Sequence, residues 1–127
     1  MREILFRGKR LDNGEWVEGY LLHDSEQNES YIAEYFEDKS AYLREVDPQT
    51  VCQFTGLTDK NGKKIFEGDI CKHRSNYSGD FIISVVTFTD GQFLVMADNN
   101  SGFNLSEKLE VIGNIHDNPE LMKGGAK

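Results

Sequence analysis

The sequence predicts a mainly β protein made of short antiparallel strands, with little helix. Three observations support this prediction. Segments rich in β-branched and aromatic residues recur at intervals of about 8 to 15 residues, a spacing typical of small barrels or of two packed sheets. Asx-Gly pairs at 13–14, 61–62 and 90–91 are strong hairpin signals. No long segment shows the 3.6-residue periodicity of an amphipathic helix.

The first third of the chain predicts a hairpin and then a strand. EILFRG at 3–8 and EWVEGYLL at 15–22 are strand candidates, and RLDNGE between them supplies the turn. The polar stretch HDSEQNES is a loop. Residues 31–43 fit two interpretations, because their apolar positions have helical spacing while their aromatic content favours a strand. We predict a strand there.

The rest of the chain predicts further short strands separated by turns. A strand follows Pro48, and TDKNGKK is its hairpin turn. FIISVVTF at 81–88 is the most apolar run and predicts a buried strand. TDGQ is the turn after it, and FLVMAD is the returning strand. LEVIGNI at 109–115 is the last strand, and Asn118-Pro119 predicts a terminal turn that winds into one helical turn through Leu121.

Nearly the same phrase occurs twice, as NGEWVEGYL from residue 13 and as NGKKIFEGDI from residue 61. Each predicts a hairpin whose second strand bends at a glycine, Gly19 or Gly68, since glycine within a strand marks a bulge or a close approach of another backbone. A small barrel needs such corners. The few matches favour convergent turn chemistry over a duplication.

Charge and composition limit the function. The 127 residues predict one compact unit, 1–127, with a net charge of −8. Residues 24–47 carry net −6, from eight acids and two bases, while residues 1–10 carry net +3. An acidic chain disfavours tight binding to nucleic acid. The absence of a signal-like or membrane-spanning apolar run predicts a cytoplasmic protein that uses no membrane.

The reactive residue types predict no cofactor, no metal site and no enzyme. Cys52 and Cys71, nineteen positions apart, are expected to be small core hydrophobes. Cys71 and His73 could share one face of a strand and a zinc ion, but further ligands have no visible source except Cys52 or a distant histidine. A metal-dependent activity is the alternative that this pair leaves open. Asp59 begins a hairpin turn rather than a calcium loop. The carboxylate of Asp69 is expected to accept backbone N–H bonds from the neighbouring turn. The histidines are expected to be surface or structural residues: His23, His73 and His116.

Four stretches together resemble the YopX family of small phage and prophage proteins. They are MREILFRGKRLDNGEWVEGYL, QFTGLTDKNGKKIFEGDI, FIISVVTF and LEVIGNIHDNPELM. The resemblance implies a gene of phage or prophage origin in a bacterial host and an SH3-like barrel in the C-terminal part. The division that follows is an N-terminal hairpin extension at 1–47, an SH3-like small-barrel core at 48–117 and a tail at 118–127. The resemblance brings no activity, cofactor or catalytic residue.

Two binding functions follow from the side chains that remain. The first is a non-catalytic protein-binding module that meets a host or phage protein, or a second copy in a homo-oligomer. It would use aromatic residues near the acidic block, namely Trp16, Tyr20, Tyr35 and Phe36. Most of the aromatic residues in this part of the chain are nevertheless expected in the core. The alternative is a nucleic-acid-associated small barrel that uses the basic hairpin at 60–74, in particular Lys60, Lys63 and Lys64.

Overall fold

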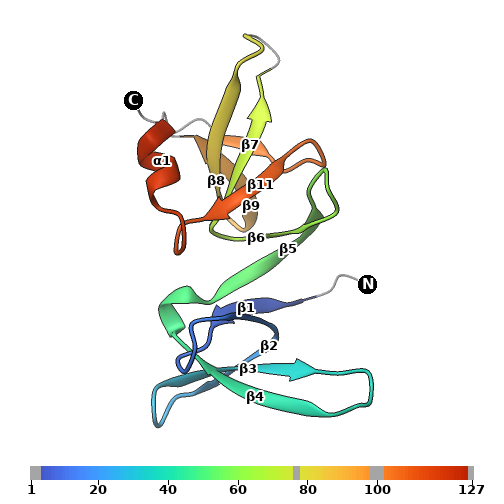
Figure 1. Ribbon diagram of the computed structural model, residues 1–127, viewed down its shortest axis with the longest axis vertical. Helices are drawn as coiled ribbons and strands as arrows, with labels where there is room; N and C mark the ends of the chain where they lie inside the picture. The colour runs from blue at the N-terminus through green and yellow to red at the C-terminus, as the bar shows by residue number, and fades with distance from the viewer. Residues whose placement is uncertain (1–3, 76–77, 98–101, 126–127) are drawn as a thin grey trace. The chain divides into compact units, whose positions relative to one another are not determined.

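The computed structural model of the chain describes residues 4–75, 78–97 and 102–125 (Figure 1). Over these residues the protein is mainly β, as predicted, with eleven strands, a 3₁₀ turn and a short helix. The strands form two antiparallel sheets, and the strand order closes neither of them into a barrel. Residue contacts group the chain into two units, 1–54 and 55–127, where its length had predicted one. The expected boundary after residue 47 lies just before the 3₁₀ turn.

The first unit contains four strands and the start of a fifth. These are β1 (Phe6–Lys9), β2 (Trp16–Asp24), β3 (Glu29–Tyr35), β4 (Ala41–Val46) and, after the 3₁₀ turn η1 (Pro48–Thr50), the beginning of β5 (Cys52–Thr58). Their order in the sheet is β4-β3-β2-β1-β5. Residues 31–43 were predicted to form one strand rather than a helix. The structure has strand there, but as parts of two strands, β3 and β4, joined by a turn.

Strand β2 changes partners at Gly19. Residues up to Gly19 pair with β1, and residues from Tyr20 onward pair with β3. A Cβ atom at Gly19 would lie 2.0 Å from the carbonyl oxygen of Ala33, well inside van der Waals contact. The glycine is needed here because the backbone of β3 approaches too closely for any side chain.

The core of the first unit lies inside this bent sheet. Val17, Ile32 and Val46 are buried there, and partly buried residues pack against them: Phe6, Leu21 and Val51. An isolated bridge joins Val46 at the end of β4 to Arg10, just beyond β1. The sheet thus curls until its two sides meet at one residue pair. The space there is narrow, because a Cβ atom added at Gly8 would lie 3.0 Å from the Cβ atom of Val46.

The second unit contains the remainder of β5 and the C-terminal strands. β6 (Lys64–Phe66) is the neighbour of β5. The other sheet has the order β10-β9-β8-β7-β11, from β7 (Asp69–Arg74), β8 (Phe81–Thr89), β9 (Gln92–Ala97), β10 (Gly102–Asn104) and β11 (Glu110–Asn114). The chain then forms helix α1 (Glu120–Gly125), which extends past the single helical turn predicted through Leu121.

The three Asx-Gly turns do not share one geometry. Asp90 and Gly91 both have positive φ, 51° and 80°, as a two-residue type I′ hairpin turn requires. At the other two pairs only the glycine has positive φ: 72° at Gly14 and 81° at Gly62. Those hairpins are therefore closed by longer loops in which the glycine alone occupies the left-handed region.

Two buried aspartates fix the turns of the second unit. Asp59 accepts backbone N–H bonds from Asn61 at 2.8 Å, Lys63 at 2.9 Å and Val111 at 3.0 Å, which ties the β5–β6 turn to β11. Burial opposes its ionisation, but these three donors outweigh burial and lower the pKa of Asp59 below its ordinary value. Asp69 accepts the Phe66 N–H at 2.8 Å, which is the structural role predicted for it.

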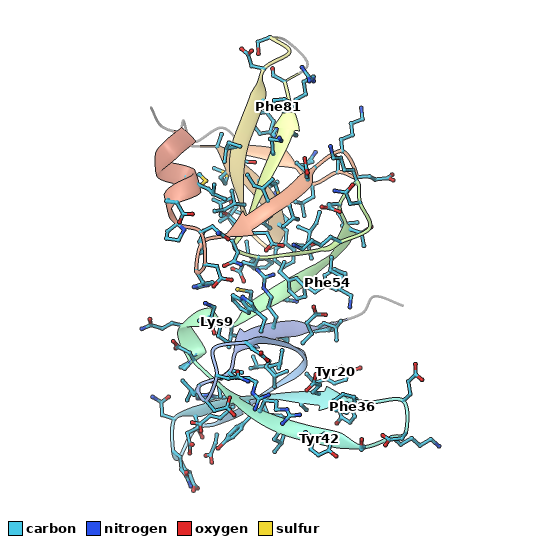
Figure 2. The ribbon with its side chains drawn as sticks, in the orientation of Figure 1. Lys9, Tyr20, Phe36, Tyr42, Phe54 and Phe81 are labelled. Atoms are coloured by element: carbon cyan, nitrogen blue, oxygen red, sulfur yellow. The ribbon has the colours of Figure 1, made fainter. Side chains whose placement is uncertain are left out.

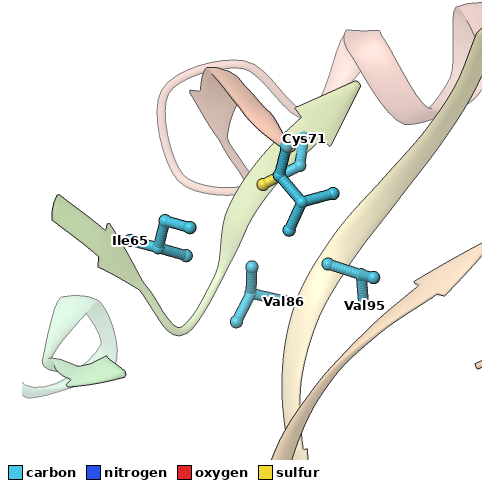
Figure 3. Packing of buried hydrophobic residues seen from close by; sticks show 5 residues of the cluster. Ile65, Cys71, Val86 and Val95 are labelled. Carbon is cyan, nitrogen blue, oxygen red and sulfur yellow. The ribbon is translucent and has the colours of Figure 1, made fainter. Parts of the chain in front are cut away.

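The second core is formed by Ile65, Cys71, Val86, Val95 and Leu109 (Figure 3). Both cysteines are buried thiols outside any disulfide, as expected. FIISVVTF was predicted to be a buried strand, and this is correct only for one face of β8. Ser84 and Val86 are buried on that face. Phe81 lies on the opposite face and is exposed. Phe88 lies on the same face as Val86 but near the end of the strand, and it is exposed as well.

Candidate functional site

Large apolar side chains are exposed around the distal end of the β3–β4 hairpin (Figure 2). Most of these aromatic residues were expected in the core, and that expectation is wrong for Tyr20, Tyr35 and Phe36. Tyr35 is 61% exposed and Leu43 is 60% exposed. We name this set the aromatic hairpin surface: Tyr20, Tyr35, Phe36, Tyr42 and Leu43.

The strand register places these side chains on both faces of the hairpin. Tyr20 is opposite Ala33, which is opposite Leu43, so Tyr20 and Leu43 share one face. Tyr35 lies on that face also, two positions from Ala33. Tyr42, opposite Glu34, belongs to the other face. Both faces of the hairpin therefore expose large apolar side chains at this end, and Glu34 lies beside Tyr42 on the second face.

Ring contacts hold the aromatic side chains in place. Tyr20 and Tyr35 meet edge to face, with ring centroids 5.5 Å apart. Phe36 and Tyr42 meet in the same way at 5.6 Å, and the guanidinium of Arg44 lies 5.1 Å from the Tyr42 ring centre. Edge-to-face pairs of this kind restrict the rings, so less conformational entropy is lost when a partner binds them.

Negative charge surrounds the aromatic hairpin surface. Glu37 and Asp38 are exposed in the turn that joins β3 to β4. Farther along the sheet a side-chain hydrogen bond with Glu29 raises the pKa of Glu45, which indicates two carboxyl groups close together. Two cations lie in the hairpin: Arg44 is held by Glu34 at 3.3 Å, and Lys39 is exposed in the turn beside Asp38. The aromatic side chains thus lie in an acidic setting.

The other predicted binding residues are not part of the aromatic hairpin surface. Trp16 is half-buried, with the guanidinium of Arg7 at 4.7 Å and the ammonium of Lys9 at 5.5 Å from its ring centre. The predicted basic residues belong to the second unit, where they lie at the β5–β6 turn or beside it: Lys60, Lys63 and Lys64. Lys60 is paired with Glu110 at 3.4 Å.

A different basic group lies on β7 and β8. The ammonium of Lys72 and the guanidinium of Arg74 each lie 4.5 Å from the ring centre of the exposed Phe81 (Figure 2). Both cations had been counted in the basic hairpin at 60–74. Sequence reasoning missed Phe81 as their partner, because only the β7–β8 register brings it opposite Arg74.

The reactive side chains that the sequence analysis singled out lie in ordinary structural surroundings. The residues that the structure describes contain no cluster of three or more His, Cys, Asp or Glu that could hold a metal ion. Burial raises the pKa of the Cys71 thiol to about 12, so the nucleophilic thiolate is disfavoured near neutral pH. His23 has Nδ1 3.2 Å from the hydroxyl of Ser30, a neighbour on the paired strand.

Fold and site together define a class: a small all-β protein of two units that exposes an aromatic, acidic hairpin. The YopX protein family matches residues 5–123, and the chain belongs to this family. A similar solved structure is the crystal structure of protein EF1440 from Enterococcus faecalis, with a TM-score of 0.58 and 25% sequence identity. The match covers 96% of this chain and 99% of that one. No curated protein matches the sequence significantly.

In the described ranges the structure contains no helix long and apolar enough to cross a membrane.

Proposed function

We propose that this chain is a non-catalytic protein-binding module that meets its partner through the aromatic hairpin surface. The observation that supports the proposal most is the exposure of five large apolar side chains around one hairpin end. Monomeric proteins rarely expose apolar patches larger than a few hundred Å², and such patches often mark protein interaction sites. Tyrosine is also among the residues that contribute most to binding energy at protein interfaces.

The partner that fits this surface is a basic, extended polypeptide segment. Residues 24–47 have a net charge of −6, so a basic segment is attracted and an acidic one is repelled. β4 is the terminal strand of its sheet. Over the described residues, its outer edge takes part in backbone hydrogen bonds near its C-terminal end, where Leu11 N–H donates to the carbonyl of Glu45 and Arg10 bridges Val46. Ala41 to Arg44 can therefore accept an added strand.

The proposal extends to origin and location, as the resemblance suggests: a phage or prophage gene whose product acts in the bacterial cytoplasm on a host or phage protein. We also infer that the second unit is SH3-like. The short strands of that unit and the break between β6 and β7 at Gly68, with φ of 86°, support this inference.

A quantitative capture experiment tests the proposal. The wild-type chain and a Tyr35→Ser/Leu43→Ser variant are immobilised and exposed to lysate of a bacterial host. Both side chains are exposed, so the variant is expected to fold. A partner recovered at stoichiometric level should be lost with this variant and retained with Leu57→Ser, which removes an exposed leucine elsewhere. Added salt should weaken the capture.

Two results would contradict the proposal: recovery of no partner at stoichiometric level, or recovery of the same partner in equal amount with the hairpin variant.

A second candidate function is binding of single-stranded nucleic acid by the second unit. One observation favours it, namely the exposed ring of Phe81 between Lys72 and Arg74. Proteins that bind single strands combine aromatic rings, on which bases stack, with cations that meet the phosphates. The acidic chain as a whole opposes this function.

Fluorescence anisotropy with a labelled single-stranded oligonucleotide separates this candidate from the first. Phe81→Ala should weaken binding by about 5-fold to 100-fold, as expected for one lost stacking contact. Lys63→Glu/Lys64→Glu and added salt should weaken it further. Phe88→Ala, at the other end of β8, is the matched control. Lack of binding by the wild type at low ionic strength would eliminate this candidate.

A further inference from the structure

A pocket of about 550 Å³ opens in the second unit, on the face of the β7–β8 pair opposite Phe81. His73 and Ile82 are directly opposite each other on β7 and β8 and both line it. The remaining sides come from β9, β10 and the segment before β11. Its volume lies within the range of pockets that enclose small molecules, about 300–1,000 Å³.

The inner part of the pocket is apolar. Val95 and Leu109, which belong to the second core and are almost fully buried, form part of its lining. Phe103 stands on one side, with its ring centre 5.4 Å from that of His73 and the two rings nearly edge to face. A flat apolar group would find a ring on one side and aliphatic carbons beneath it.

Two buried polar atoms lie on the same side of the β7–β8 pair. Within the described residues, Nδ1 of His73 and the hydroxyl of Ser84 are shielded from solvent and have no hydrogen-bond partner. Ser84 shares a strand face with Ile82, two positions away. A buried polar group without a partner costs about 1–3 kcal/mol, so each requires a further group that satisfies it. His73 itself lines the pocket, although its Nδ1 atom is shielded.

The pocket rim is positively charged. Lys108 lines it and is exposed, and Ser75, Asn104 and Ser106 supply hydroxyl and amide groups beside it. Arg74 also contributes to the lining, although its guanidinium lies against Phe81 and donates to the carbonyl of Gly79. Among the residues that the structure describes, the lining contains no Asp or Glu. Its charge therefore favours an anion over a cation.

We propose that this pocket binds a small aromatic carboxylate. The ring lies against Phe103 and over Val95 and Leu109. The carboxylate meets Lys108 at the rim, and the imidazole ring of His73 lies beside the ligand. Burial lowers the pKa of His73, so its imidazole is neutral near pH 7 and adds no second charge. This site lies wholly in the second unit and is independent of the aromatic hairpin surface.

Nuclear magnetic resonance titration with three probes tests this proposal. Benzoate has both the ring and the charge, benzamide has the ring alone, and acetate has the charge alone. Benzoate, added up to about 20 mM, should produce saturable shifts at Val95, Leu109 and the imidazole nitrogens of His73, as expected for a weak ligand of this size. Benzamide should bind more weakly, and acetate should not saturate.

Two variants separate the charge at the rim from nonspecific effects. Lys108→Gln should reduce the affinity for benzoate by about 2-fold to 5-fold, the value of a partly exposed ion pair, and leave benzamide unchanged. Lys63→Gln, an exposed lysine in the β5–β6 turn, should alter neither. The proposal is wrong if no probe gives saturable shifts at these residues, or if Lys108→Gln binds benzoate as tightly as the wild type.

Discussion

Replacing Gly19 with alanine tests the corner at which β2 passes from β1 to β3. The new Cβ atom would lie 2.0 Å from the Ala33 carbonyl oxygen, a backbone atom held in the ladder by the Tyr20–Ala33 pair. Relief requires β3 to move away. Overpacking costs about 1–3 kcal/mol, and each ladder hydrogen bond that is lost costs roughly 1 kcal/mol. We therefore predict a loss of about 3 kcal/mol in the free energy of unfolding of the first unit.

Urea unfolding followed by tryptophan fluorescence measures this loss, because Trp16 is the only tryptophan and lies in the first unit. Gly14→Ala is the matched control. Gly14 has φ of 72° and open space around it, so alanine there adds only the strain of a left-handed backbone, about 1 kcal/mol. Equal destabilisation by the two substitutions would refute the close approach of β3 to Gly19.

Three further predictions concern Asp59, Cys71 and the hairpin tip. Asp59→Asn should destabilise the second unit by about 2 kcal/mol at neutral pH, while the exposed Asp80→Asn should change little. Because folding lowers the pKa of Asp59 below 3.8, its contribution is present at higher pH, and circular dichroism in urea should show the difference shrinking below about pH 4. In a Cys52→Ser background, Cys71 should react with a thiol reagent about 1,000-fold more slowly in the native than in the unfolded protein, since its folded pKa is about 12. Lys39→Gly should stabilise the β3–β4 turn slightly in thermal unfolding, because Lys39 has φ of 71°.

The fold class and the strand positions could be predicted because turn chemistry and β-formers are local signals. The turn at Lys39 was harder to predict, because a lysine occupies the left-handed position where glycine or asparagine is usual. The local signal was Asp38, whose carboxylate accepts the Ser40 N–H at 3.0 Å. The two copies of the repeated phrase also differ for a nonlocal reason. Gly68 supplies a positive φ between β6 and β7, whereas Gly19 makes room for the backbone of β3.

The candidate site was predicted only in part. Tyr20, Tyr35 and Phe36 were identified from aromatic residues near acidic ones, and the structure places them around one hairpin. Whether these side chains are exposed depends on the register, which decides the face of each strand that meets the core. Spacing in the sequence alone does not show the register. Tyr42 and Leu43 carried one available signal: consecutive apolar residues on an edge strand leave one of them on each face.

Site-specific photocrosslinking in the host cell tests most directly that the aromatic hairpin surface binds a protein. A photoreactive phenylalanine derivative replaces Tyr35 in one variant and Leu57 in another, both exposed positions. The proposal predicts one heterologous crosslinked protein from position 35 that is absent from position 57. Crosslinks only to a second copy of the chain, equal products from both positions, or no product at position 35 would contradict it.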